Sequence, residues 1–181
     1  MKNLIIVLSA FTMFTFAACA QTKNKSTKKV VEFPKADADV RAGLNNVLTA
    51  YYGLKDALVA DDEATAKAKA KDFLAAMEKV DEKKMTIPEH IFYTELADKI
   101  KYDAGHIKSA PNIEHMREHF NAFSKNIWEL MKAFKANNGT AMYKDYCPMQ
   151  KAFWISKEEG IKNPYYGKQM LECGNVEETV K

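Results

Sequence analysis

Sulfur-containing side chains gather near the C-terminus of this chain, in the run from Tyr143 to Val176. Cys147 and Met149 flank Pro148, whose restricted φ angle holds the segment in an extended turn. Cys173 follows later in the same run. Thiolate and thioether sulfur prefer soft ions such as Cu(I) over Mg²⁺ or Ca²⁺. The run therefore predicts a soft-metal site that contains Cys147, Met149 and Cys173.

A disulfide between Cys147 and Cys173 is the competing interpretation. Two cysteines in an exported protein pair with each other more often than they bind a metal. The bond would enclose a loop of roughly 26 residues and stabilise the folded domain by about 3 kcal/mol in the chain-entropy model. It would leave only the weaker thioether and imidazole donors for a metal. The sequence leaves both interpretations open.

Histidines on one predicted helix extend the set of candidate ligands. At 100° per residue, His119 lies about 70° from the centre of the apolar stripe of its helix, and His115 lies about 110° away. His119 is therefore expected at the margin of the core, where a neutral imidazole is a good ligand for copper or zinc. The i, i+4 spacing of His115 and His119 can place two ligands on one metal, although no recognised zinc motif surrounds them, so His115 is the weaker candidate. His106 lies about 130° from its own stripe, which predicts a surface histidine.

Met170, in the same C-terminal run as Cys173, is a further candidate ligand, because its thioether is a soft donor. Methionine also fills irregular gaps in protein cores, so packing explains Met170 equally well.

Catalytic motifs are missing from the sequence. It contains no Gly-x-Ser-x-Gly elbow, no phosphate-cradling glycine loop, no His-Glu-x-x-His and no Cys-x-x-Cys. Glu158 and Glu159 are adjacent, and adjacent residues do not face one another as a carboxylate dyad does. We therefore expect a protein that is not an enzyme.

The first 19 residues have the pattern of an export signal. Lys2 supplies the positive charge, and an apolar stretch runs from Leu4 to Phe16. Phe16-Ala17-Ala18-Cys19 is similar to a lipobox, in which Cys19 becomes the lipidated N-terminus. The prediction is a membrane-anchored lipoprotein that faces the periplasm or the cell surface. Cleavage before Gln21 would instead give a soluble periplasmic or secreted protein.

Four amphipathic helices are expected to position the candidate ligands. Residues 20–35 are polar and lysine-rich, which predicts a disordered linker. From residue 36 to residue 139, apolar residues recur at spacings of three and four in four segments with short connectors. This pattern predicts an all-α fold, an up-down four-helix bundle. Residues 140–176 are expected to form a loop-rich flap across the bundle, so residues 36–181 make a single domain.

Charge and composition narrow the function classes. The net charge of +3 is too balanced to suggest a nucleic-acid partner, because proteins that bind nucleic acids carry concentrated basic faces. The chain has only seven glycines and five prolines, few for an all-β fold, so composition also favours helices.

The C-terminal motifs resemble those of a bacterial family of unknown function. The resemblance rests on Cys147-Pro148-Met149, Trp154-Ile155-Ser156, Asn163-Pro164-Tyr165-Tyr166-Gly167 and Cys173-Gly174, preceded by Arg117-Glu118-His119-Phe120, and it extends from Ala36 to Val176. Members of that family occur as small exported proteins and as domains fused to periplasmic adaptor subunits of copper/silver efflux pumps. The resemblance implies a helical bundle with a heavy-metal role, with His119, Cys147, Met149, Met170 and Cys173 as the matching candidate ligands.

Two functions follow as expectations. In the first, the protein binds a soft metal, copper above all, for sequestration or for hand-over to an efflux-pump adaptor or a metallochaperone. In the second, it is a metal-free interaction module in which a Cys147–Cys173 disulfide staples the flap to the bundle. In both, only the lipid anchor would contact the membrane.

Overall fold

The computed structural model describes residues 31–181. The predicted export signal, the lipidation site Cys19 and most of the predicted linker lie outside the described residues. Phe33, near the end of that linker, packs its ring 5.0 Å from Phe134 and 5.5 Å from Phe92, between centroids. No helix in the described part of the chain is long and apolar enough to cross a membrane.

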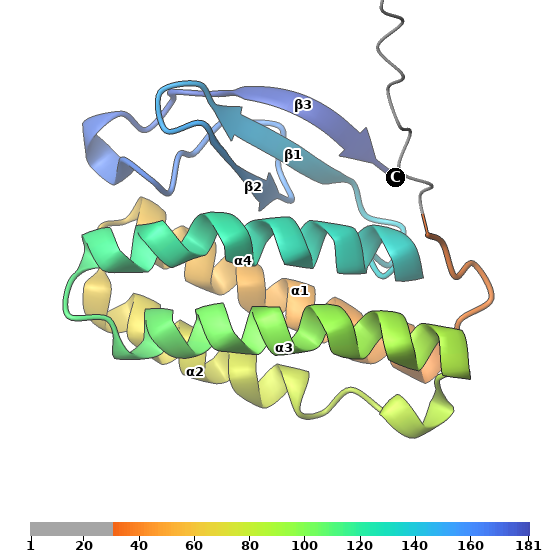
Figure 1. Ribbon diagram of the computed structural model, residues 1–181. Helices are drawn as coiled ribbons and strands as arrows, with labels where there is room; N and C mark the ends of the chain where they lie inside the picture. Colours follow the sequence, from red (N-terminus) through yellow and green to blue (C-terminus); the bar gives the residue numbers. More distant parts are fainter. Residues whose placement is uncertain (1–30) are drawn as a thin grey trace, which may run out of the picture.

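Four α-helices are present where the apolar stripes predict them. They are α1 (Ala38–Val59), α2 (Glu63–Met77), α3 (Ile87–Ser109) and α4 (Ile113–Phe134), with a short 3-10 helix η1 (Glu82–Lys84) before α3. Side chains cap their first turns: the Asp62 carboxylate accepts the Thr65 N–H before α2, and the Asn112 side chain accepts the His115 N–H before α4. Each helix follows its neighbour in an up-down order, and α4 returns to pack against α1 (Figure 1).

The C-terminal segment contains a β-sheet, so the predicted all-α fold is wrong. The strands β1 (Met142–Cys147), β2 (Ala152–Ser156) and β3 (Asn175–Val180) form an antiparallel sheet in the order β2-β1-β3. The sheet covers the face of the bundle made by α4 and α1, with α2 and α3 on the opposite side (Figure 1). The protein is therefore a mixed α and β fold, and its C-terminal part combines this three-stranded sheet with a long loop, residues 157–174.

Physical features of the strands explain why the residue pattern does not predict them. A β-bulge lies between Lys144 and Asp145, so buried residues of β1 do not alternate regularly. The apolar run of β2 is too short to be distinguished from a helix segment by its period. A four-residue turn, Pro148 to Lys151, joins these two strands and requires a positive φ at Lys151.

Buried aromatic residues attach the sheet to the bundle. The Tyr51 hydroxyl on α1 accepts the Ile155 N–H of β2 at 3.0 Å and lies 2.8 Å from the Ser124 hydroxyl on α4. Trp154 is fully buried, and its ring packs edge-on against Tyr165, 6.1 Å between centroids. Because a hydroxyl joins three elements inside an apolar layer, the position of β2 relative to the helices is well determined.

Arg117 ties the loop after β2 to the bundle. Its guanidinium donates to the backbone oxygens of Pro164 at 2.8 Å and Leu58 at 3.0 Å, and to the Asp61 carboxylate at 2.6 Å. The Lys168 N–H also donates to Asp61, at 3.0 Å. These contacts hold the pKa of Asp61 below its usual range, the Lys168 hydrogen bond first and Arg117 next.

Candidate metal centre

Three histidines converge where α3 meets α4. His106 lies in the last turn of α3, His115 in the first turn of α4 and His119 one turn further along α4. One ring nitrogen from each histidine can be chosen so that all three lie within 4.8 Å of one another. All three side chains are half-buried, so a metal ion could reach them from solvent.

The helical hairpin explains why these residues meet. Helices α3 and α4 are antiparallel and are joined by the short connector from Ala110 to Asn112, in which Pro111 prevents α3 from continuing. In such a hairpin, residues at similar distances before and after the connector face each other. His106 precedes the connector about as closely as His115 follows it, and Asp103 and His119 are likewise matched one turn further away.

Ring contacts show how closely the three side chains pack. The rings of His106 and His119 are nearly parallel, with centroids 4.4 Å apart, and His115 lies edge-on to His119 at 5.0 Å. The exposed ring of Tyr102 covers His106, 4.4 Å between centroids.

Carboxylates hold two of the three imidazoles. His119 Nδ1 lies 2.9 Å from Asp103 Oδ1, and His115 Nδ1 lies 3.0 Å from Glu118 Oε2. An ionised carboxylate only accepts hydrogen bonds, so each Nδ1 must carry the proton. In the neutral ring the lone pair is then on Nε2, the nitrogen that could bind a metal. This carboxylate–histidine arrangement is the usual outer sphere of histidine metal ligands.

The donor set defines which ions fit. Neutral imidazole suits Cu²⁺, Zn²⁺ and Ni²⁺, whereas Mg²⁺ and Ca²⁺ prefer oxygen ligands. Three protein ligands with a fourth position open to water or substrate are typical of zinc sites that are not purely structural. The buried carboxylate of Asp103, 6% exposed as a residue, adds negative charge behind His119 and favours a bound cation.

The predicted sulfur ligands lie elsewhere. Cys147 is fully buried at the end of β1, with its Sγ 3.9 Å from the Sγ of Cys173. Met149 is on the β1–β2 turn and 60% exposed, and Met170 is half-buried before Cys173. The structure thus brings the predicted candidates together in two pairs, His115 with His119 and Cys147 with Cys173. Among residues 31–181, His119 and the two cysteines do not form a compact group of three ligands.

His106 is the ligand candidate that the sequence analysis placed on the surface. Its position about 130° from the apolar stripe predicts a surface histidine only when α3 is taken by itself. The missing information was the pairing of α3 with α4, which brings a neighbouring helix over this part of α3. The short connector at Pro111 was the available signal, because it predicts an antiparallel hairpin whose facing residues can be paired by counting.

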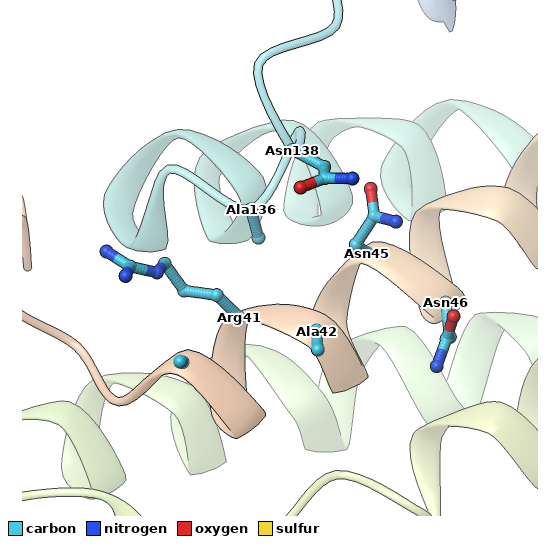
Figure 2. Close-up of a pocket in the computed structure, with 7 residues that line it drawn as sticks. Arg41, Ala42, Asn45, Asn46, Ala136 and Asn138 are labelled. Carbon is cyan, nitrogen blue, oxygen red and sulfur yellow. The ribbon is translucent and has the colours of Figure 1, made fainter.

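A separate pocket lies between the start of α1 and the turn after α4. It has a volume of about 290 Å³, and its lining includes Arg41, Asn45, Asn46 and Asn138 (Figure 2). Asn45 and Asn138 point toward each other, whereas Arg41 extends away from them and donates to the Pro34 backbone oxygen at 3.4 Å. Neutral amides with one guanidinium offer neither a metal-ligand set nor an acid–base pair, so the histidine cluster is the stronger candidate.

Comparison with known proteins assigns the helical part to a family. The model of a family described as a protein of unknown function, DUF3347, matches residues 47–139. The matched region includes all three histidines and ends before the sheet and before the four sulfur-containing candidates Cys147, Met149, Met170 and Cys173. No curated protein and no solved structure matches the chain.

Proposed function

The chain belongs to the DUF3347 family of proteins of unknown function, and we propose that it binds copper through His106, His115 and His119. The observation that carries the proposal is the convergence of these three imidazoles, two of them oriented by carboxylates. Metal-ligating histidines commonly have such carboxylate partners at their second ring nitrogen.

Copper is favoured by the chemistry of the donors. For a given set of nitrogen ligands, Cu²⁺ binds more tightly than the other divalent ions of the first transition row. The proposed ion is therefore divalent copper, whereas the sulfur run alone suggested Cu(I). Zinc is the next best fit, because three imidazoles and an open position also suit Zn²⁺.

The cellular role follows from the predicted export and from the family resemblance. An exported and lipid-anchored chain would hold its site in the periplasm or at the cell surface. There it would sequester copper or pass it to an efflux-pump adaptor or a metallochaperone. The half-buried rings support transfer, since a site that is open to solvent can be approached by the ligands of a second protein.

A competition titration tests the proposal. The full chain would be titrated with Cu²⁺ against a chromogenic chelator, beside a His106→Ala variant and a His90→Ala variant. His90 is the matched control, because it is another histidine of α3, its ring is hydrogen-bonded to Glu82, and it lies outside the group of three histidines found among residues 31–181. We expect the wild type and His90→Ala each to bind one equivalent of Cu²⁺ tightly. The affinity of His106→Ala for Cu²⁺ should be at least tenfold lower.

The contradicting result is equal affinity in all three proteins. If all three proteins compete weakly with the chelator, the protein does not bind copper tightly, and the metal-free interaction module is favoured. Equal tight competition would place the copper outside the three-histidine cluster.

A further inference from the structure

Cys147 and Cys173 lie side by side at one end of the sheet and are not part of the group of three histidines. Cys147 ends the central strand β1, and Cys173 comes just before β3, the strand that pairs with β1. Their sulfurs are 3.9 Å apart and both thiols are free. An S–S bond is about 2.05 Å long, so the two sulfurs need to approach each other by only about 2 Å to form a disulfide.

The surroundings hold both cysteines in place. The Gln150 N–H approaches Cys147 Sγ at 3.5 Å, and the Asn163 side chain donates to the Cys173 backbone oxygen at 2.7 Å. Gly174, next to Cys173, packs so tightly that a Cβ there would come within 2.9 Å of Trp154 and of the Tyr146 backbone oxygen. The two sulfurs therefore remain near each other because the backbone around them cannot shift easily.

The chemistry of the pair fits a structural bond better than a reactive site. Desolvation raises the pKa of the Cys173 thiol, and its contact with Cys147 raises it further. Cysteines that act as nucleophiles or metal ligands have lowered pKa values beside cations or helix N-termini. Among the described side chains, no Lys, Arg or His makes a hydrogen bond to either sulfur.

We propose that Cys147 and Cys173 form an intramolecular disulfide that locks residues 157–174 and β3 onto β1. The inference does not depend on the metal site. The bond forms by exchange with an external disulfide, such as oxidised glutathione or a protein thiol oxidase. The more accessible Cys173 thiolate attacks that disulfide and releases one thiol. The Cys147 thiolate then attacks the Cys173 sulfur and releases the second. Two thiol protons are lost, and the two electrons reduce the external disulfide.

The lock has a defined structural consequence. Between β2 and β3 the chain crosses the sheet in a long loop held by Asn163, which accepts the Tyr165 N–H at 2.8 Å, and by Arg117. The disulfide would close this loop covalently at its far end and restrict the unfolded chain. It would also remove both thiolates from competition for copper, leaving imidazole as the better donor.

The test uses the full chain equilibrated in a buffer of reduced and oxidised glutathione. Thiols would be alkylated after unfolding and counted by intact mass. Melting temperature and hydrogen exchange would be compared for the oxidised protein, the reduced protein and Cys173→Ser. Cys173 is chosen because it is half-buried, whereas Cys147 is fully buried and its replacement could prevent folding.

We expect no alkylation of Cys147 or Cys173 in the oxidised protein. We also expect a melting temperature roughly 5–10 °C above that of the reduced protein and of Cys173→Ser, with slower exchange confined to residues 157–174 and β3. Alkylation of both thiols after oxidation would overturn the proposal, and so would identical melting and exchange in the oxidised and reduced forms. Copper binding by Cys173→Ser measures the histidine site separately, so the two proposals can fail independently.

Discussion

Asp103 on α3 accepts a hydrogen bond from His119 on α4, with Oδ1 and Nδ1 2.9 Å apart. The bond holds the His119 ring with Nε2 available for a metal. We therefore expect Asp103→Asn, which keeps the shape but removes the charge, to weaken Cu²⁺ binding roughly ten- to a hundredfold without changing the stoichiometry. Competition titration measures both quantities.

Glu118→Gln is the matched comparison for Asp103→Asn. Glu118 also holds a histidine, His115, but 71% of its side chain is exposed, whereas 9% of the Asp103 side chain is. Solvent screens the exposed carboxylate, so its replacement should weaken binding by less. An Asp103→Asn variant that binds copper as tightly as the wild type would show that the carboxylate does not support a metal ligand.

Gly167 lies where the C-terminal loop contacts the bundle, so a substitution there tests this contact. Its φ is +52°, and a Cβ there would overlap the Asp61 carboxylate. Gly167→Ala should therefore lower stability by roughly 1–3 kcal/mol, through backbone strain and loss of the Asp61 contacts to Arg117 and Lys168. Urea denaturation followed by circular dichroism measures this change.

Gly160→Ala is the control, since Gly160 has open space around its Cα and no positive φ. It should leave the stability within about 0.5 kcal/mol of the wild type. Equal stability of Gly167→Ala and Gly160→Ala would mean that the loop is not held against Asp61.

The buried carboxyl of Asp145 should make the stability of the protein depend on pH. Burial raises the pKa of this carboxyl to about 6 from 3.8. Ser156 and Trp154 lie beside it and lower the pKa in part, yet the carboxylate has no hydrogen bond of ordinary geometry. Between about pH 4 and pH 6 the folded chain binds this proton more tightly than the unfolded chain does. The contribution of Asp145 to stability therefore falls as pH rises through that window and stays low above it.

Asp145→Asn should remove this dependence. We compare the free energy of unfolding of the variant with that of the wild type at each pH. This difference should favour the variant by roughly 1–3 kcal/mol more at pH 7 than at pH 4. Denaturation of both proteins from pH 4 to pH 8 measures the difference. A constant difference across that range would show that Asp145 does not titrate in the folded protein as burial predicts.

The helices could be predicted from sequence because their physical signals are local. Apolar residues at spacings of three and four, Asn112 and Asp62 at the helix starts, and the Thr86–Glu89 capping box are all readable within one turn. The sheet could not be predicted in the same way. Its strands are stabilised by pairing across the chain, β1 with β3 above all, and the bulge at Lys144 and Asp145 removes the alternation.

The candidate site was predictable only in part, for a related reason. The i, i+4 spacing of His115 and His119 is a property of one helix and was visible in the sequence. His106 and Asp103 join the cluster from the neighbouring helix, so their roles depend on the α3–α4 contact. The adjacency of Cys147 and Cys173 likewise depends on the pairing of β1 with β3, which the sequence did not reveal.

X-ray absorption at the zinc edge tests the three-histidine site most directly. Zn²⁺ is a suitable probe because it binds both imidazole and thiolate and does not oxidise thiols, and Zn–N and Zn–S distances differ clearly, at about 2.0–2.1 Å and about 2.3 Å. The full chain would be loaded with one equivalent of Zn²⁺ under reducing conditions, so that the cysteines can compete. Three-histidine binding predicts a first shell of nitrogen and oxygen only, with the outer scattering of about three imidazoles, and the loss of about one imidazole in His106→Ala. A sulfur shell at about 2.3 Å would contradict the account and would place the metal at Cys147 and Cys173.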